Sequence, residues 1–365
     1  MQTKAAPPWI RTTASPAVTW CVINHNGAEH LRIAFQALKE QNWEFAETLL
    51  VDNGSVDDSL RVASQFPGLK VIQLQENHGP GAARNVGFAA AKHDLILFQD
   101  NDIRLGRDTT RRLVDLFLSQ PSSLAVAPRV LYAHDPEIIQ FDSADCHFLG
   151  LMATCNADLP ASQGDSRQRE TSSLVTACFL LNRKRWGDKS LFDESLGFNL
   201  EDHDFAVRAK LAGHSLWIEP NATVQHGLGT TALSYRTDQV PSAQRLYYLT
   251  RNRWIIIRKC FSTRTLMFLS PAFLLFEFMQ LIWLTTQGHF ATWWGAVRSF
   301  AKKWKSLGPA RQQIQHERRV GDKAVLQDTP LPLTQWVRDQ PLPRYVVPIA
   351  DVVLRGYWHL VRRLI

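Results

Sequence analysis

Short apolar runs alternate with segments of helical periodicity along the first hundred residues. Four runs have the length and β-branched content of buried strands, at residues 18–24, 48–52, 69–74 and 95–98. The segments between them place apolar residues three and four positions apart, at residues 29–40, 57–65 and 81–92. Strands that alternate with helices need crossover connections, so the pattern predicts an α/β fold with a mostly parallel central sheet and helices on both faces.

The same alternation continues and then weakens. A helix is expected at residues 108–119 and a strand at 124–131, whereas residues 132–172 are polar and rich in Gly, Ser and Asp. We interpret that stretch as a long loop that shapes a site. Order returns with a strand within residues 174–182 and then with a helix that ends at Gly213.

The last hundred residues differ in character. As a helix, residues 266–284 would extend about 29 Å, close to the thickness of a bilayer core. Pro271, Glu277 and basic residues on both sides argue against a simple span. We therefore expect a re-entrant or interfacial helix pair, with a single span and a buried core helix as the alternatives.

Charge is distributed unevenly along the chain. Residues 241–365 hold 19 Lys and Arg against 6 Asp and Glu, whereas residues 1–240 hold 22 against 28. In residues 344–365, helical spacing separates an apolar face from Arg355, Arg362 and Arg363, which predicts a surface anchor. The many Trp, Phe and Leu residues of the basic tail favour an anionic membrane surface over nucleic acid as its partner.

Length and composition set the expected organisation and location. The chain has 365 residues and is 45% hydrophobic, and we divide it into an arm at 1–16, a sheet domain at 17–260 and a helical, membrane-associated region at 261–365. The N-terminus lacks the apolar core of a signal peptide, and the five scattered cysteines fit a reducing compartment. The expected location is cytoplasmic, peripheral or monotopic on the inner face of the cell membrane.

An acidic pair, Asp100 and Asp102, directly follows the apolar run at 95–98. On a strand the two side chains share a face, where they repel each other unless a cation or a proton compensates them. Oxygen ligands of this kind suit Mg²⁺ or Mn²⁺, which also bridge to substrate phosphates. The alternative is a solvated acidic turn, which a lone DxD pattern does not exclude.

Four stretches then occur in order: VINHNG, VDNGSVDDS, ENHGPGAARNVGFAAA and FQDND. Together they resemble the motifs of family 2 glycosyltransferases of the GT-A fold, over roughly residues 18–260. The tail is similar to that of rhamnosyl and galactofuranosyl transferases in that family. The resemblance implies a hexosyl- or deoxyhexosyltransferase of cell envelope polysaccharide biosynthesis, with a nucleotide-sugar donor, a divalent metal (Mg or Mn) and a saccharide or lipid-linked acceptor.

The resemblance also implies which residues bind the donor, and they come from five parts of the chain: Asn24, Asn26, Asp52, Asn77, Gly79, Arg84, Asn85, Asp100 and Arg251. Glycines in NHGPGAARN let the backbone approach a pyrophosphate, while the helix N-terminus supplies positive potential. The alternative role of Asp52 is that of a turn residue, since Asn, Gly and Ser follow it. His25 stands where the family has an aromatic contact to the base, a departure that leaves the base open.

The segment FNLEDHDF resembles the (F/Y)xxEDxD pattern of the same family. By that resemblance Asp202 is the catalytic base for an inverting transfer, and Glu201 and Asp204 orient the acceptor or hold Asp202. Carboxylates at a helix N-terminus are also stabilised by its dipole, which is the structural alternative. His226 would complete a metal site with Asp100 and Asp102.

Two other functions remain as alternatives. A nucleotidyltransferase combines a similar sheet with a carboxylate pair, but it needs a basic, glycine-rich signature near its first strand. Here that strand leads into NHNGAEH, which has no Lys or Arg. A non-catalytic, membrane-bound sugar-nucleotide binder would have no use for the base at Asp202.

Overall fold

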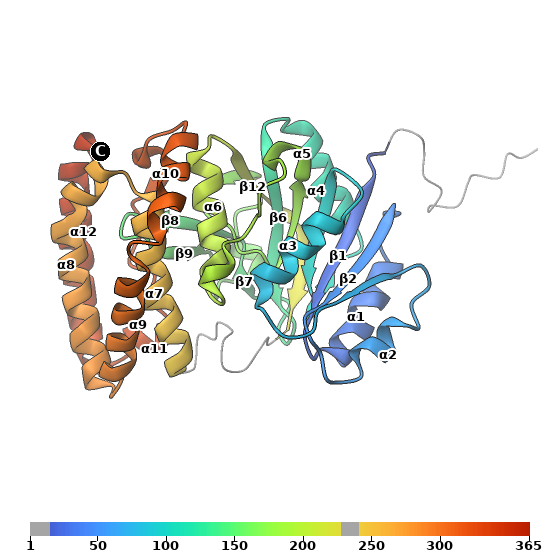
Figure 1. Ribbon diagram of the computed structural model, residues 1–365, viewed down its shortest axis with the longest axis horizontal. Helices are drawn as coiled ribbons and strands as arrows, with labels where there is room; N and C mark the ends of the chain where they lie inside the picture. Colours follow the sequence, from blue (N-terminus) through green and yellow to red (C-terminus); the bar gives the residue numbers. More distant parts are fainter. Residues whose placement is uncertain (1–14, 228–240) are drawn as a thin grey trace, which may run out of the picture.

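A computed structural model describes residues 15–227 and 241–365, so the expected N-terminal arm lies almost wholly outside the described residues. The chain forms an elongated body with the sheet at one end and a group of long helices at the other (Figure 1). Along the main sheet the strand order is β10 (Arg169–Thr171), β12 (Ser215–His226), β6 (Ser123–Tyr132), β11 (Cys178–Asn182), β4 (Leu95–Asp100), β1 (Val18–Asn24), β2 (Glu47–Asp52) and β3 (Lys70–Gln73). Two short strands, β5 (Ile103–Leu105) and β7 (Ile139–Phe141), pair with β12 and β6.

Both faces of the sheet are covered, as the strand and helix pattern predicts. In β1, Trp20 and Val22 pack into one core cluster, whereas Cys21 and Ile23 pack into another. The first cluster includes residues of α1 (Ala28–Lys39), α2 (Ser59–Ala63) and α4 (Thr109–Ser119), and the second includes residues of α3 (Pro80–Ala90), α5 (Arg183–Trp186) and α6 (Glu201–Leu211). Burial on both sides explains why β1 is a continuous apolar run rather than an alternating one.

The sheet is mixed in strand direction. Pairing is parallel from β3 through β2 and β1 to β4, and parallel again between β6 and β12. Strand β11 runs antiparallel to both of its neighbours, β4 and β6. The expected parallel sheet is therefore found where strands and helices alternate in sequence.

The prediction of a long loop at residues 132–172 is wrong. This segment holds β7, β8 (Ser143–His147), β9 (Met152–Cys155), the 3-10 turn η1 (Ala161–Gln163) and β10. A second sheet orders β13 (Leu326–Gln327), β8 and β9. Strands of three to five residues carry too little periodicity to detect, and β8 obtains one partner from a segment far along the chain.

The C-terminal region is helical and packs against α6. Its long helices are α7 (Ala243–Cys260), α8 (Thr263–Thr286), α9 (Phe290–Lys303), α10 (Leu307–Glu317) and α12 (Pro341–Val361), with α11 (Gln335–Arg338) before the last. A third core cluster joins α6, α7, α8, α12 and β13. The C-terminal region is therefore packed onto the sheet domain through a shared core, and Figure 1 shows α7 beside α6.

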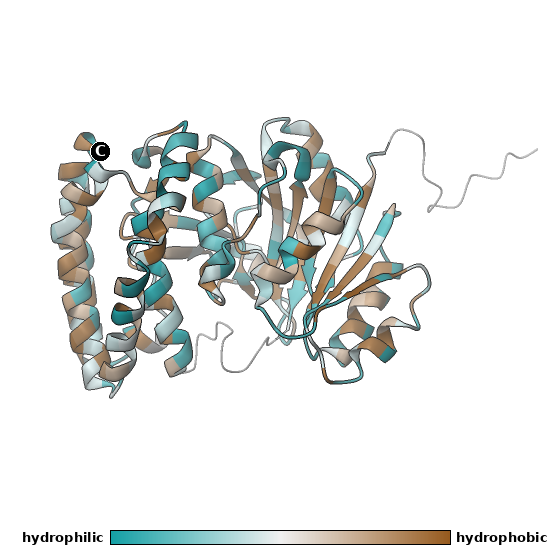
Figure 2. Cartoon of the chain, viewed as in Figure 1, coloured by the Kyte–Doolittle hydropathy of each residue, from teal (hydrophilic) through white to brown (hydrophobic). Residues whose placement is uncertain are grey.

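Helices α8 and α12 lie together at the end of the molecule and are largely apolar (Figure 2). By length and composition α8 could cross a membrane, with a mean hydropathy of 1.7 and 28% of its apolar window buried. The prediction that the apolar face of the last helix is a surface anchor is wrong in part. Trp358 is buried and stacks on Phe148, and Arg355 pairs with Asp328 at 2.7 Å. Core packing divides the apolar residues of α12 between the interior and the surface.

Helix α7 holds the turn that precedes α6. Asn199 and Leu200 both adopt left-handed backbone angles, with φ of 62° and 65°, which is unfavourable for a leucine. The buried Asn252 amide nitrogen lies 3.1, 2.9 and 2.6 Å from the carbonyl oxygens of Leu196, Phe198 and Asn199. This side chain from α7 therefore stabilises a strained turn at the start of α6.

We predict that Asn252→Ala lowers the free energy of unfolding by about 3 kcal/mol, because buried carbonyl oxygens lose their donor. Asn221→Ala is the matched control, since Asn221 is exposed and makes one side-chain bond, to the Ser166 carbonyl. Its expected change is within about 0.5 kcal/mol. Chemical denaturation measures both variants, and equal losses would contradict the role given to Asn252.

Candidate active site

The carboxyl ends of three parallel strands meet at one edge of the sheet. The register places Asn24 beside Asp52, and Ile23 beside Asp100. A cavity of about 1400 Å³ opens at this edge and extends to the C-terminal helices. Ligands of sheets with parallel strands bind at such edges, so this cavity is the candidate active site.

Asp52 lies beneath the cavity and does not line it. Its carboxylate accepts from Asn24 Nδ2 at 2.9 Å and from the Ser55 hydroxyl at 2.6 Å. It is fully buried. Asn24 does line the cavity, and its Oδ1 accepts from Asn101 Nδ2 at 2.8 Å. These contacts are those of a turn residue, which is the alternative role that the sequence analysis gives Asp52.

A second turn is built around Asn53 and Asn77, which both line the cavity. Asn53 Nδ2 donates to Asn77 Oδ1 at 2.9 Å, and Asn77 Oδ1 also accepts from the Gly79 backbone at 2.9 Å. Gly79 has φ +89°, and a Cβ there would lie 2.6 Å from the Gly197 carbonyl oxygen. Only glycine fits that position, which starts α3 beside the cavity. Asn26 lines the cavity as well, and its Oδ1 accepts from the Val56 backbone at 2.8 Å.

Arg84 of α3 is the buried cation of the cavity wall. One guanidinium nitrogen donates to Asp100, and Nη1 lies 3.9 Å from Glu201. Within the described chain, Nε and Nη1 are buried without a hydrogen-bond partner. Arg84 is therefore placed to receive further oxygen acceptors. Asn85, on the same helix, instead bonds to the Phe192 backbone and lies outside the cavity lining.

Asp102 and His226 are brought together by strand pairing. β5 begins just after Asp102 and pairs antiparallel with the end of β12, and the Gly227 backbone donates to the Asp102 carbonyl at 2.9 Å. Asp102 Oδ2 then lies 3.4 Å from His226 Nε2. Burial acts to raise the pKa of Asp102, but His226 offsets it and the pKa lies below its usual value. Burial acts to lower the pKa of His226, whereas Asp102 raises it above its usual value.

The predicted set of three metal ligands is not assembled. Across residues 15–227 and 241–365, no three His, Cys, Asp or Glu side chains gather as a metal-binding group. The reason is that β4 ends at Asp100, and Asn101 and Asp102 form a turn, so the two carboxylates do not continue one strand face. Asp100 pairs with Arg84, while Asp102 faces His226.

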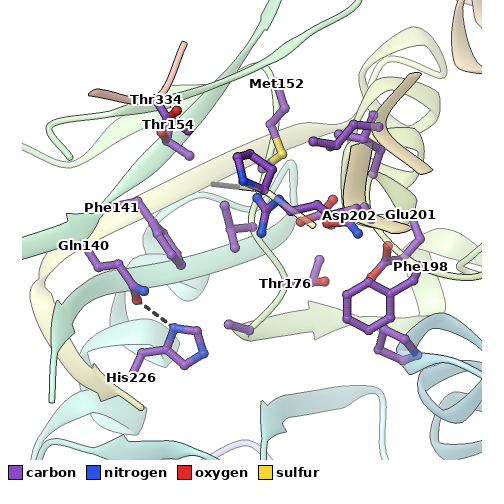
Figure 3. A pocket seen from close by; sticks show the side chains of 18 of the residues that line it. Gln140, Phe141, Met152, Thr154, Thr176, Phe198, Glu201, Asp202, His226 and Thr334 are labelled. Atoms are coloured by element: carbon purple, nitrogen blue, oxygen red, sulfur yellow. Dashed lines mark hydrogen bonds between the residues drawn. The ribbon is translucent and has the colours of Figure 1, made fainter. Parts of the chain in front are cut away.

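Asp102 and His226 nevertheless fit a divalent cation. Asp102 Oδ2 is buried and has no hydrogen-bond partner among the described residues. Nδ1 of His226 donates to Gln140 Oε1 at 2.6 Å (Figure 3). In a neutral imidazole Nε2 then carries the lone pair, and this atom lies 3.4 Å from Asp102 Oδ2. Two acceptors that face each other are stable with a cation or a proton between them. Mg²⁺ and Mn²⁺ accept two protein ligands, because they take the others from water or phosphate.

Glu201 and Asp202 form the opposite side of the cavity, at the start of α6 (Figure 3). Burial and the charge of Asp202 raise the pKa of Glu201 to about 8, and burial raises that of Asp202 to about 6. Near neutral pH the pair therefore carries one proton, with Asp202 ionised. Asp202 is half-buried and Glu201 buried, so Asp202 is the more accessible carboxylate.

Asp204 and Arg251 are not brought to the cavity. Asp204 is fully buried and pairs with Arg208 at 2.7 Å and Lys259 at 2.8 Å. Arg251 donates to the Leu196 carbonyl at 2.5 Å. The cavity is instead lined by Arg253, which pairs with Glu277 of α8.

The stretch 132–172 does line the cavity, as expected of a segment that shapes a site, but sequence reasoning named none of its residues. The missed residues of the cavity wall come from segments without a motif, namely Gln140, Phe141, Met152, Thr154 and Thr176. Gln140 matters most, because its side chain orients the imidazole of His226. The signal that could have found it was the short apolar strand β7, which the loop prediction overlooked.

Comparison with known proteins relates part of the sheet domain to a family. The model of glycosyl transferase family 2 matches residues 19–188. A putative glycosyltransferase, EpsH of Bacillus subtilis, is 36% identical over 92 residues, which are 24% of this chain and 26% of that protein. The chain thus spans about a quarter of the length of this relative.

Two solved structures share the fold. GalNAc-T7, solved with UDP, GalNAc and Mn²⁺, superposes with a TM-score of 0.54 at 15% identity, over 70% of this chain and 50% of that one. TarS 1–349 of S. aureus, solved with UDP, gives 0.51 at 17% identity, over 95% of this chain and 91% of that one. These findings show that residues 19–188 match glycosyl transferase family 2 and that the chain has a GT-A-like fold.

Proposed function

We propose that the chain is an inverting glycosyltransferase that moves a sugar from a nucleotide-diphosphate donor to a hydroxyl of a saccharide or lipid-linked saccharide. One observation carries the proposal: a single cavity contains the accessible carboxylate of Asp202, the cation of Arg84 and the Asp102–His226 pair. A transfer of this kind needs a base for the acceptor and compensation of a leaving diphosphate. The cavity contains residues suited to both.

Each group has a defined task in direct displacement. The ionised Asp202 accepts the proton of the acceptor hydroxyl as its oxygen attacks the anomeric carbon. Asn24, Asn26, Asn53 and Asn77 offer amide groups to the nucleoside, and Arg84 offers unpaired N–H groups to diphosphate oxygens. Attack from the side opposite the leaving diphosphate inverts the anomeric carbon.

A divalent cation completes the charge balance. Asp102 and His226 would hold it, and when bound it neutralises the negative charge that develops on the diphosphate. Gln140 keeps His226 oriented toward Asp102. GalNAc-T7 was solved with Mn²⁺ and UDP, which supports testing Mn²⁺ first.

A membrane surface is the proposed partner of α8 and α12. Met267, Leu274 and Phe278 of α8 are 63%, 70% and 61% exposed, and Ile349 and Val352 of α12 are 67% and 71% exposed. Basic residues from the same region, including Arg264, Arg344, Arg362 and Arg363, suit anionic head groups. This arrangement supports interfacial binding rather than a single span, because the inner face of α8 belongs to a core. The side that we propose is the cytoplasmic one.

We predict that Asp202→Asn lowers nucleotide release from the natural donor at least about 100-fold, because the amide cannot accept the acceptor proton. Release is measured over UDP, dTDP and GDP sugars, in lipid and with Mn²⁺ or Mg²⁺. The wild-type rate should fall in acid with a midpoint near pH 6, as Asp202 becomes protonated. Asp158→Asn, which changes another carboxylate of the cavity wall, is the control. Nucleotide release by Asp202→Asn at the wild-type rate would show that Asp202 is not the base. Another residue would then be the base, or the reaction would be a different one.

We predict that Asp102→Asn weakens Mn²⁺ binding about 10- to 100-fold in the presence of a nucleoside diphosphate, because a charged ligand is lost. Mn²⁺ binding can be followed by electron paramagnetic resonance, independently of activity. Asp115→Asn removes an exposed carboxylate of α4 and should leave the affinity unchanged. Unchanged affinity in Asp102→Asn would place the cation elsewhere.

We predict that Leu274→Glu weakens binding to phosphatidylglycerol vesicles about tenfold, since a carboxylate replaces apolar area at the interface. Val56→Glu is the control, because Val56 is 92% exposed and precedes α2, in the sheet domain. Vesicle sedimentation measures both variants. Equal binding by the two would show that α8 does not face lipid.

A further inference from the structure

The active-site cavity has two chemically different ends. One end is polar and is lined from the first 102 residues, including Asn26, Asn53, Asn77 and Asp102. The other end is lined from α7, α8 and the segment around α11. It combines the apolar side chains of Leu246, Leu249, Phe276, Trp283, Leu333 and Val337 with polar and charged ones, including Arg245, Arg253, Gln280, Thr334, Arg338 and Asp339. Glu201 and Asp202 line the same cavity from the start of α6.

The cavity is larger than one ligand requires. Its volume of about 1400 Å³ exceeds the roughly 300–1000 Å³ of a typical small-molecule pocket. A nucleotide sugar is polar along its whole length, since it consists of a base, two sugars and a diphosphate. It therefore matches the polar end and leaves the apolar end to the acceptor.

The aliphatic side chains of this end favour an acceptor that carries an apolar chain over a free saccharide. Sugars are recognised through hydrogen bonds to their hydroxyl groups and through stacking on aromatic rings. Leu246, Leu249, Leu333 and Val337 offer neither, and burying sugar hydroxyls against them without partners would be unfavourable. An alkyl or isoprenoid chain gains free energy from contact with the same side chains.

Helix α8 links this end of the cavity to the exposed apolar surface. Phe276 and Gln280 line the cavity, whereas Leu274 and Phe278 of the same helix are 70% and 61% exposed. Apart from Glu277, which pairs with Arg253, residues 265–286 carry no charge. An apolar chain seated against α8 inside the cavity would thus lie one helix diameter from lipid.

We propose that the cavity end formed by α7, α8 and α11 is a subsite for the apolar chain of a lipid-linked acceptor. This inference rests on the proposed glycosyl transfer and narrows its acceptor to the lipid-linked class. The chain lies between Leu249 of α7 and Phe276 of α8, so that the saccharide it carries meets Asp202. The donor occupies the polar end at the same time.

The test uses the full-length protein and a series of hexyl, octyl and decyl β-glucosides below their micellar concentrations. Calorimetry measures their binding in the presence of Mn²⁺ and UDP, dTDP or GDP. Each added methylene that enters the subsite should tighten binding by up to about fourfold. Glucose without a chain should bind far more weakly than the decyl glucoside.

Two variants on opposite sides of α8 locate the chain. Gln280→Glu places a nearly isosteric carboxylate in the cavity and should weaken decyl glucoside binding at least about tenfold, because the charge loses water. Leu274→Glu, on the exposed side of the same helix, should leave that affinity within about twofold. Circular dichroism confirms that both variants are folded.

The outcomes separate the subsite from the proposed function. If a nucleotide binds but the affinity for the glucosides does not depend on chain length, the subsite is overturned and the transferase proposal stands. The subsite is also overturned if Leu274→Glu, and not Gln280→Glu, weakens binding, because the chain then lies on the outer surface. Failure of every nucleotide to bind, with or without Mn²⁺, would overturn the proposed function and the subsite with it. Chain-length dependence that Gln280→Glu removes supports the subsite.

Discussion

The antiparallel pairing of β5 with the end of β12 is the constraint on which the active site depends. It joins residues that are more than a hundred positions apart and places His226 at 3.4 Å from Asp102. β7 then adds Gln140, which orients the imidazole. Without this pairing, Asp102 would be an acidic residue in a turn, apart from His226.

Charge in the cavity is organised around buried groups with incomplete pairing. Arg84 balances Asp100 and lies near Glu201, yet retains unpaired N–H groups. Burial raises the pKa of both Glu201 and Asp202. Such groups are costly in a folded protein unless a ligand completes their interactions, which is why they indicate a binding site rather than a stabilising network.

Helix α7 connects the candidate active site to α8 through three consecutive residues. Arg251 and Asn252 bond to carbonyl oxygens of the turn before α6, and Arg253 pairs with Glu277 of α8. The turn contains Leu200 in a left-handed conformation and leads directly into Glu201. The C-terminal helices therefore support the geometry of the active site as well as forming the apolar surface.

By itself the sequence determined the strands and helices of the first hundred residues and the positions of Asn24, Asp100 and Asp202, because buried strands and helix starts leave local patterns. Tertiary structure alone decided that Asp52, Asn85, Asp204 and Arg251 lie outside the cavity lining, and that Gln140 and α8 line it. It also placed Trp358 in a core. The reason is physical. Which side of a residue is buried depends on segments that are far away along the chain. The short strands that bring these segments together have too few residues to show the two-residue hydrophobic period of a strand.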